Sequence, residues 1–599
     1  MGAQFRGSLV PLADLEEPSP LVRVTPAFYL RLRSVTQHAS CFSQVSILRV
    51  GIEMDLLLCA GLTAVESILA NNIPGQESRP VSGKVSFALF LGQYFVVKFY
   101  RIFLYHRYFS PLRHIPGPTD NHFLFGQALN FLRAETPTTL YIKWTREYPD
   151  VPFIRYLTWG NTEVLFPVNI NAHREVLQYQ CYSLQKPAWF LRIVKEVAGH
   201  GLILMEGEEH KAHRKMLGGS FSLKNIRKLK PIFQEKARDL VRYFDQCIRE
   251  NDNQTGVIDC TTTFSKAILD IMGQAILGVK LDYVKPTDEK SEQSNIIKKG
   301  CSFHEAYDIF FSPDGMGKLL LFANGFFPTR WMPFKANRDF LFAMDWLNDV
   351  LRGLIRDRTR EVTAATAAGK YEANDSMDLV TFVVEESLPG GIAEGIGETE
   401  FLGHLLEFMA AGHDTSANML SWALYIMALN PDIQDTLREE LMQVAADPTF
   451  NELERLPYLE AFSKETLRIY SPSTTYQRET NTDIVVEGVH IPNGTLFDLC
   501  PSVTLLNPAI WGEDVDDFKP TRWNHLTGDQ LSPYAFSPFS NGPRICIGRG
   551  FAMFEIKTIL FEIVRNYRFI SVDSGFTVEN PGFTLRPHGL KVRFEKIKN

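Results

Sequence analysis

The chain has 599 residues, 45% of them hydrophobic and 22% charged, and its formal net charge at pH 7 is -7. A nucleic-acid-binding protein normally has a basic excess, a disordered chain has fewer apolar residues, and a polytopic membrane protein has several long uncharged runs. We therefore exclude a nucleic-acid partner and expect a large globular protein with at most one membrane anchor. The 8 cysteines are too sparse for a disulfide scaffold and form no C-x-x-C pair, which favours a reducing compartment.

Residues 1–80 have no sustained hydrophobic period, so we predict an N-terminal extension to which the sequence assigns no structure. Within it, the apolar run 56–65 lies between Asp55 and Glu66 and has about ten residues, half of what a membrane-spanning helix needs. We expect that this run alone does not span a membrane. Residues 1–53 are either a targeting extension or precede the natural start, for which Met54 is the candidate.

Residues 81–110 contain the better candidate for a membrane anchor. The stretch 85–105 is largely aromatic and aliphatic, and Lys98 and Arg101 are its charged interruptions. We expect these cations to reach the headgroup layer at the cytosolic end of a single anchor, because long basic side chains extend from an apolar segment to the membrane surface. The basic flank that follows would keep the body of the protein in the cytosol. A buried core helix is the alternative.

The rest of the chain is predicted to be a hinge followed by one large unit. Residues 111–118 contain a Pro-Gly-Pro segment, which predicts a stiff hinge because proline fixes φ and prevents a continuous helix. Residues 119–599 have no internal repeat, so we expect a single large domain, mainly α with a minor β-sheet component. The predicted elements are long helices at 224–249, 336–362 and 401–429, a surface loop at 363–369 and a β-hairpin at 484–494.

The most informative segment is residues 538–550, Pro-Phe-Ser-Asn-Gly-Pro-Arg-Ile-Cys-Ile-Gly-Arg-Gly. Glycines on both sides of Cys546 let the backbone approach a flat ligand and let amide N–H groups point at the sulfur. An apolar helical pattern follows at 552–564, so the cysteine precedes a helix N-terminus. We expect the helix dipole, with Arg544 and Arg549, to favour thiolate over thiol. The alternative is a buried structural cysteine in a tight turn.

The spacing Phe539-x-x-Gly542-x-Arg544-x-Cys546-x-Gly548 resembles the haem-binding loop of the cytochrome P450 family. The resemblance implies that Cys546 is the axial thiolate ligand of the iron in haem b, that Phe539 packs on the sulfur side, and that Arg544 pairs with a haem propionate. Gly542 and Gly548 belong to the same cofactor-binding loop. Thiolate ligation in this family favours cleavage of the O–O bond.

A second motif, Glu465-Thr466-Leu467-Arg468, places an acid and a base three residues apart on one face of a helix that begins near Pro457. By itself it indicates a solvated pair of little energetic value. Downstream, residues 518–523 resemble the family's segment that contains Pro and Arg. The resemblance implies that Arg522 completes a buried structural network with Glu465 and Arg468.

Residues 411–416, Ala-Gly-His-Asp-Thr-Ser, interrupt the long apolar pattern 401–429 with residues that form helices poorly. We expect a functional distortion of the helix there, and a harmless polar patch is the alternative. The segment resembles the family's oxygen-activation groove, which implies that Asp414 and Thr415 form a catalytic pair of acid and alcohol. A carboxylate that relays protons and a hydroxyl that positions water would deliver the two protons that O2 activation needs.

Residues 209–215 form a charge-rich pattern typical of a surface helix, with His210 and Arg214 four residues apart on one face. The family usually has Trp and Arg at this spacing, and both reach haem propionates. The resemblance therefore implies that Arg214 binds the cofactor. His210 stands where the family has Trp and is a candidate for the same role.

The resemblance covers residues 115–599 and is closest to fungal microsomal members of secondary metabolism. It implies a haem-thiolate monooxygenase in the endoplasmic reticulum membrane, with its catalytic domain facing the cytosol, that inserts one oxygen atom from O2 into a lipophilic small molecule. Electrons would come from a separate NADPH-cytochrome reductase. Five cations are expected to dock this partner near Cys546: Lys211, Arg214, Lys215, Arg549 and Lys557.

Four apolar segments resemble the family's pocket-lining regions: residues 189–191, 310–311, 319–327 and 583–585. They favour a terpenoid, a polyketide, a fatty acyl chain or a sterol as substrate, and they do not rank these. Two other functions stay open. A haem-thiolate isomerase or dehydratase would use Cys546 without external electrons, whereas a haem sensor or electron carrier would need neither Asp414 nor Thr415.

Overall fold

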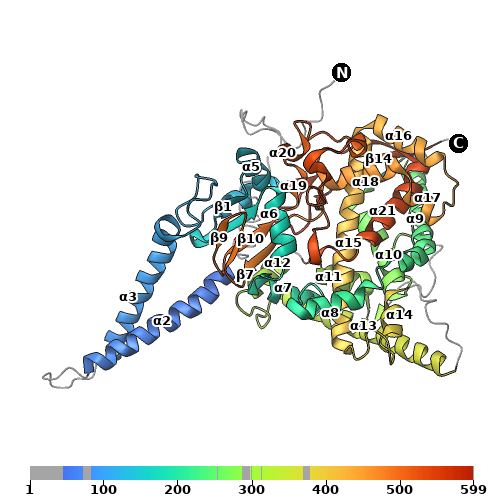
Figure 1. Cartoon of the computed structure of the whole chain (residues 1–599). Coiled ribbons are helices and arrows are strands. Elements are labelled where there is room, and N and C mark those ends of the chain that lie inside the picture. The colour runs from blue at the N-terminus through green and yellow to red at the C-terminus, as the bar shows by residue number, and fades with distance from the viewer. Residues whose placement is uncertain are drawn as a thin grey trace.

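The computed structural model describes residues 45–71, 82–251, 254–285, 297–298, 300–311, 313, 315–368 and 378–597. Residues 1–44 of the predicted extension lie outside this part of the chain. The described residues form a mainly helical body and an N-terminal helical hairpin that projects from it (Figure 1).

Helices make up most of the body, and the long helix α15 (Glu398–Leu429) runs through its middle (Figure 1). It packs along α10 and also contacts α7, α13, α18 and α21. The helices of the body are α4 (Ala128–Arg133), α5 (Thr139–Glu147), α6 (Ile170–Arg174), α7 (Ala188–Ala198), α8 (Gly207–Gly218), α9 (Leu223–Asn251), α10 (Cys260–Leu277), α11 (Phe303–Phe311), α12 (Gly315–Asn324), α13 (Lys335–Ala367), α14 (Leu379–Glu386), α16 (Pro431–Met442), α17 (Phe450–Glu454), α18 (Pro457–Ile469), α19 (Ser502–Leu505), α20 (Pro508–Trp511) and α21 (Arg549–Asn566).

The main sheet has five strands in the order β1-β2-β10-β7-β3. All its pairs are antiparallel except β2 with β10. Strand β2 is apolar on both faces, with Leu165 in one core cluster and Val164 and Phe166 in another, as expected of a strand covered on both sides. The strands of this sheet are β1 (Phe153–Leu157), β2 (Glu163–Pro167), β3 (Leu184–Gln185), β7 (Tyr476–Thr480) and β10 (Leu496–Leu499).

A second sheet, in the order β11-β14-β4, joins the end of the chain to β4 between α9 and α10. The strands of this sheet are β4 (Thr255–Asp259), β11 (Tyr567–Val572) and β14 (Lys591–Lys596). The other described strands form three two-stranded sheets: β5 (Ile297–Lys298) with β6 (Cys301–Ser302), β8 (Ile484–Val486) with β9 (Val489–Ile491), and β12 (Thr577–Val578) with β13 (Pro587–His588).

The predicted fold class is confirmed, and most predicted elements are found. The three helical patterns lie within α9, α13 and α15. Strands β8 and β9 form the predicted hairpin, and its turn residues Glu487 and Gly488 both have positive φ, as in a type I′ turn. The sequence missed β1, β2 and β3, which lie before residue 200.

Two local predictions are wrong. The loop predicted at 363–369 is largely helical, because α13 continues to Ala367 through alanines, the strongest helix formers, and Thr366 Oγ1 donates to Val362 O at 2.8 Å. The distortion predicted at 411–416 is absent, since α15 runs through these residues without a break. A Cβ at Gly412 would lie 2.4 Å from Met272 Cε, so this glycine serves close packing against α10.

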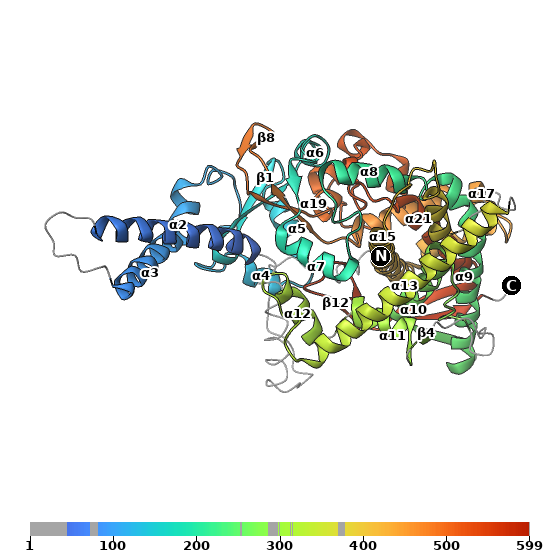
Figure 2. The same cartoon turned by 90° about the horizontal axis from the view of Figure 1, so that it is seen from below.

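The N-terminal hairpin consists of α2 (Val45–Asn71) and α3 (Gly83–Phe99), and a π-helical segment, Tyr100–Phe109, continues α3. Both views show the hairpin pointing away from the body (Figures 1 and 2). The apolar run 56–65 is therefore part of a 27-residue helix. The 27-residue helical stretch Gly83–Phe109 is the one helix in the described part of the chain that is long and apolar enough by itself to cross a membrane.

The predicted Pro-rich hinge, residues 111–118, is hydrogen-bonded to strand β1 of the main sheet and packs against it. Pro116 O accepts a hydrogen bond from Arg155 N at 2.9 Å. A Cβ at Gly117 would lie 1.8 Å from Arg155 O, so only glycine allows this close approach to β1. Leu112 and Ile115 are buried in the adjacent core.

Candidate active site

Cys546 lies on the wall of a cavity of about 350 Å³, which we call the thiol cavity. Residues of α10, α15, α21 and the cysteine loop form its walls, which are mostly apolar, among them Met272, Phe408 and Phe551. The exposed surface of Cys546 faces this cavity, since the surrounding atoms otherwise enclose the side chain. The cysteine loop is therefore arranged to present sulfur to a buried ligand.

The environment of Cys546 differs from the prediction. Burial raises the pKa of the Cys546 thiol, and the N–H of Gly548 and the charges of Arg214 and Arg549 lower it by less. The N–H groups at the helix start and the charge of Arg549 thus act in the predicted direction. Desolvation outweighs them, because the thiolate has lost its water.

The other loop residues have distinct roles. Phe539 O accepts a hydrogen bond from Cys546 N at 2.9 Å, and the Phe539 side chain lines the thiol cavity. Gly548 also lines it. Gly542 has φ 70°, and a Cβ there would lie 2.1 Å from Leu177 O, so this glycine lets the loop pack against its neighbour.

Four basic side chains gather around Glu206, the residue just before α8, and we call them the Glu206 cluster: Lys186, His210, Arg478 and Arg544. Lys186 Nζ bonds to Glu206 Oε1 at 2.7 Å, and Arg544 Nη2 bonds to Glu206 Oε2. Arg544 also donates to Met205 O at 3.1 Å.

The Glu206 cluster has more positive charge than its one carboxylate balances. Burial, with Arg478 nearby, lowers the pKa of Lys186 to about 7. Burial and the surrounding cations lower the pKa of His210 to about 3, so this histidine is neutral. Arg544 Nε is buried and has no hydrogen-bond partner.

These observations fit the haem that the resemblance implies. A haem brings two propionates, and Arg478 and Arg544 line the thiol cavity beside Cys546. Two added carboxylates would balance the excess charge and give Arg544 Nε an acceptor. Arg214 does not line the cavity, although its charge acts on Cys546.

The sequence missed Arg478 and Lys186. Arg478 lies in β7 and Lys186 directly follows β3, in a part of the chain where no strand was predicted. Only the pairing of β3 with β7 brings them close to Arg544.

A second cavity, of about 450 Å³, also borders α15, and we call it the distal cavity. Ala411 and Thr415 line both cavities, so the two meet at α15. Each of the four predicted pocket segments contributes to the distal cavity: Trp189, Phe311, Leu321, Phe322, Phe583 and Thr584. Its lining is mainly apolar, as small-molecule sites usually are.

Asp414 and Thr415 both line the distal cavity, but their side chains are not hydrogen-bonded to each other and have separate partners. Asp414 Oδ2 accepts a hydrogen bond from Thr584 Oγ1 at 2.5 Å, and Arg586 Nη1 lies 3.9 Å from Asp414 Oδ1. Thr415 Oγ1 donates to Ala411 O at 2.9 Å. The two residues thus share a cavity, and their side chains bond to different partners.

One end of the distal cavity is polar, which the sequence did not indicate. Asp498 on β10 is buried, and its Oδ2 accepts hydrogen bonds from Tyr141 and Tyr156. Its Oδ1 has no hydrogen-bond partner, and neither has Oε1 of Gln477, which lies opposite Asp498 in the sheet. All four residues line the distal cavity. This end therefore offers hydrogen-bond acceptors to a ligand.

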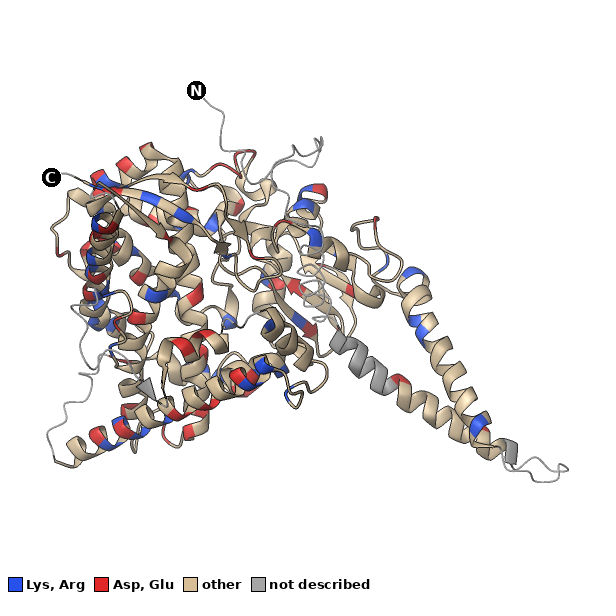
Figure 3. Ribbon diagram, turned by 180° about the vertical axis from the view of Figure 1, so that it is seen from behind, with Lys and Arg blue, Asp and Glu red and all other residues tan. Residues whose placement is uncertain are grey.

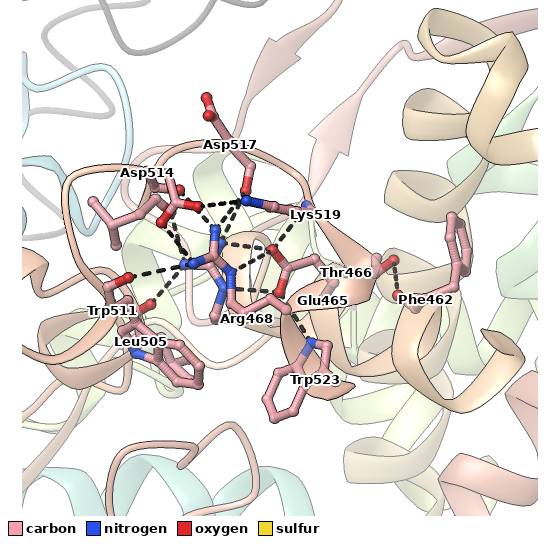
Figure 4. A network of polar contacts seen from close by, with 12 residues as sticks. Phe462, Glu465, Thr466, Arg468, Leu505, Trp511, Asp514, Asp517, Lys519 and Trp523 are labelled. Carbon is pink, nitrogen blue, oxygen red and sulfur yellow. Dashed lines mark hydrogen bonds and ion pairs between the residues drawn. The ribbon is translucent and has the colours of Figure 1, made fainter. Parts of the chain in front are cut away.

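The structure brings Glu465, Arg468 and Arg522 together in a buried network, which we call the Glu465 network (Figure 4). Arg468 donates two hydrogen bonds to the Glu465 carboxylate, from Nε at 2.9 Å and from Nη2 at 2.8 Å. Arg522 Nε lies 3.3 Å from Glu465 Oε1. Trp523 Nε1 and the backbone N of Lys519 also donate to Glu465, each at 3.0 Å.

The five cations proposed as a docking surface do not act as one group. Lys557 is buried and pairs with Glu454 at 3.0 Å and Glu460 at 2.6 Å, so it is unavailable to a partner protein. Lys211 pairs with Glu208 at 2.5 Å. The prediction is wrong for Lys557, because α21 turns this side chain toward α17 and α18.

Comparisons with known proteins agree with this site. Residues 115–594 match the cytochrome P450 family. Cytochrome P450 monooxygenase sphH of Aspergillus fumigatus is 29% identical, over 83% of this chain and 91% of that protein. Cytochrome P450 monooxygenase FUM15 of Gibberella moniliformis is 28% identical, over 82% and 89%. The putative cytochrome P450 CYP13A4 of Caenorhabditis elegans is 27% identical, over 76% and 88%. The chain belongs to the cytochrome P450 family of oxidoreductases.

Proposed function

We propose that this protein is a haem-thiolate monooxygenase that hydroxylates a lipophilic small molecule in a secondary-metabolite pathway. Haem b, ligated by Cys546, would occupy the thiol cavity, and the substrate would occupy the distal cavity. Electrons would come from a separate NADPH-cytochrome reductase. Its relatives from Aspergillus and Gibberella are named monooxygenases, which supports the reaction class.

The observation that carries this proposal is the junction of the two cavities at Ala411 and Thr415. A thiol faces one cavity, and apolar side chains surround the other. Ala411 leaves open space at the junction, while Thr415 places a hydroxyl there. Such a junction lets an apolar C–H bond approach an oxygen-activating centre.

The overall reaction consumes one substrate, one O2, two electrons and two protons, and it yields the hydroxylated product and water. A haem bound at Cys546 supplies the reductive activation of O2, and its thiolate ligand favours O–O cleavage. Thr415 Oγ1 would hold a water at the junction, and Asp414 would pass protons toward it from Thr584 and the polar side of the distal cavity. The aromatic walls would exclude bulk water.

The lining of the distal cavity narrows the substrate class. Aromatic and aliphatic walls suit a terpenoid, a polyketide, a fatty acyl chain or a sterol. Asp498 Oδ1 and Gln477 Oε1 favour members of these classes that have a hydroxyl or amino group, because a buried acceptor without a donor is costly. We expect this donor to lie away from the carbon that is oxidised.

We also propose that the protein resides in the endoplasmic reticulum membrane with its catalytic domain facing the cytosol. The apolar helical stretch Gly83–Phe109 supports membrane attachment. A cytosolic catalytic domain would meet both a soluble cofactor, NADPH, and a membrane-bound reductase. Arg214, Lys215 and Arg549 remain candidates for the contact with this reductase.

A carbon monoxide difference spectrum tests the haem ligation. The full chain, purified in detergent with its haem, should give the strongly red-shifted band of thiolate-ligated ferrous haem. Cys546→Ser should lose this band. Cysteines from outside the thiol cavity, such as Cys247, provide matched controls, and Cys247→Ser should keep it. An unchanged band in Cys546→Ser would reject the assigned ligand.

Labelled O2 separates the proposed reaction from its alternatives. The substrate is first identified as the metabolite that accumulates when the gene is deleted. With NADPH and a purified reductase, one labelled oxygen atom should appear in the product. Conversion without reductase would indicate an isomerase or dehydratase, and haem binding without any conversion would indicate a sensor or electron carrier.

Replacement of Thr415 tests the proton delivery. Thr415→Ala should keep the haem band and consume NADPH, yet lose most of the product, because the hydroxyl that would hold the proton-delivering water at the junction is gone. Thr415→Ser keeps the hydroxyl and should restore a large share of the product. Equal product yield per NADPH in the wild type and Thr415→Ala would show that Thr415 plays no part in proton delivery.

A further inference from the structure

The two helices of the N-terminal hairpin turn their polar side chains toward each other. Asp55 of α2 is fully buried, and its carboxylate contacts Lys98 Nζ at 2.7 Å and Arg101 Nη2 at 2.9 Å. These are the two cations that interrupt the apolar sequence of α3 and its continuation. Both cations therefore contact α2 within the hairpin.

Further polar contacts join the helices closer to the tip. Gln93 Nε2 donates to Glu66 at 2.7 Å, and Thr63 Oγ1 donates to Gln93 at 3.2 Å. Ser67 Oγ and Ser86 Oγ lie 3.0 Å apart. These polar side chains therefore find their partners in the other helix, as bilayer-buried helices require.

The outer surface of the hairpin is apolar. Large side chains on both helices are exposed, among them Leu57, Ile68 and Leu69 on α2 and Phe87, Phe95 and Val96 on α3. Leu57 is 74% exposed and Phe95 69% exposed. Figure 3 shows that charged residues are spread over the body but are sparse on the coloured part of the hairpin. Exposed apolar surfaces of this extent usually mark a site of contact with a membrane or another protein.

The hairpin also has the length of a bilayer. Helix α3 has 17 residues, which at about 1.5 Å per residue gives roughly 25 Å. The hydrocarbon core of an endoplasmic reticulum membrane is about 27 Å thick. The part of α2 from Asp55 to Asn71 also has 17 residues, so the two helices match in length from the Asp55 ion pairs to the tip.

We propose that α2 and α3 insert into a lipid bilayer together, as one antiparallel hairpin in which Asp55 neutralises Lys98 and Arg101. The chain before α2 then lies on the same side of the membrane as the catalytic domain. A single span by α3 would place these two parts on opposite sides. This topology is independent of the chemistry at Cys546.

Protease protection distinguishes the two topologies. The full chain with an N-terminal epitope tag is expressed in sealed microsomes, which are then treated with protease or extracted with alkaline carbonate. The hairpin predicts that the protein resists carbonate and that protease removes the tag from intact vesicles. A protected tag would show a single span. Extraction of the protein by carbonate would show that the hairpin does not insert. Either result would overturn the proposal.

Variants of Asp55 test the neutralisation. Asp55→Leu leaves two cations unpaired and should lower the carbonate-resistant fraction several-fold. The triple variant Asp55→Leu/Lys98→Leu/Arg101→Leu removes all three charges and should restore it. Asp573→Leu, which removes an acid from the body, is the control. Equal membrane retention in Asp55→Leu and the wild type would refute the role of Asp55. The haem band reports folding of the body in each variant.

Discussion

The Glu465 network and the Glu206 cluster are both built from arginines around a glutamate, buried in the first and half-buried in the second, and they differ in how completely the arginines are paired. Arg468 directs all of its N–H groups at acceptors: Glu465, Leu505 O, Val515 O and Asp517 O. In the Glu206 cluster, Arg544 donates to Met205 O and Glu206, and its Nε has no hydrogen-bond partner.

The charges differ in the same way. In the Glu465 network, Arg522 has a second carboxylate partner, Asp514, at 2.8 Å, so two guanidinium groups face two acids. In the Glu206 cluster, Lys186, Arg478 and Arg544 share one acid. A network that is complete in the protein alone serves the fold. One that lacks acceptors is suited to a ligand that brings them.

The largest expected effect follows from breaking the complete network. Glu465→Ala leaves Arg468 buried without its main counter-ion, and loss of one partner of a buried ion pair costs about 3–5 kcal/mol. We expect a large decrease in the urea concentration at half-unfolding, with and without haem. Fluorescence and the haem band would follow unfolding separately.

Glu465→Gln provides the matched control, because it keeps an acceptor for Arg468 and loses only the charge. Its stability should lie between those of the wild type and Glu465→Ala. If Glu465→Ala unfolds at the same urea concentration as the wild type, the network does not stabilise the fold.

The second effect follows from weakening the incomplete cluster. Arg544→Ala and Arg478→Ala should each weaken haem retention by roughly 10- to 100-fold, since a hydrogen bond to a charged group contributes about 1.5–3 kcal/mol. Transfer of haem to an excess of apomyoglobin measures the retention. The stability of the haem-free protein should change much less than in Glu465→Ala.

Arg356→Ala is the control for haem retention, because Arg356 is an exposed arginine that also pairs with a glutamate, Glu398, at 2.9 Å. Its haem transfer should match the wild type. Haem retention that is unaffected in both Arg544→Ala and Arg478→Ala would place the propionates elsewhere.

The difference between the two regions also decides what the sequence could predict. Glu465 and Arg468 lie three residues apart on one helix, and the loop around Cys546 is a continuous motif, so local spacing and a family resemblance were enough. Arg522 was predicted from a second continuous segment, residues 518–523. These parts of the site depend on neighbours in the sequence.

The Glu206 cluster could not be predicted in this way. Lys186, Glu206, Arg478 and Arg544 come from four separate segments, and the register of β3 with β7 brings the first and third together. The same holds for Asp55 and Lys98, which are 43 residues apart. Contacts of this kind depend on tertiary packing, which periodicity and motif spacing do not encode.

The smallest effect concerns the pH dependence of stability, which should differ between the two forms of the protein. Without haem, burial lowers the pKa of Lys186 from 10.5 to about 7 in the folded state. The unfolded chain therefore binds more protons between these pH values, so the free energy of unfolding should rise as the pH increases from 7 toward 10.5. Haem propionates would hold the proton on Lys186 and remove this rise.

Urea unfolding of the wild type and of Lys186→Met, across this pH range, measures the contribution of Lys186. The rise in stability with pH should be smaller in haem-free Lys186→Met than in the haem-free wild type, because methionine has no proton to lose. When both proteins are loaded with haem, the stability of Lys186→Met and that of the wild type should have the same pH dependence. An equal pH dependence of the haem-free proteins would mean that Glu206 already balances Lys186 fully, and the Glu206 cluster would then be as complete as the Glu465 network.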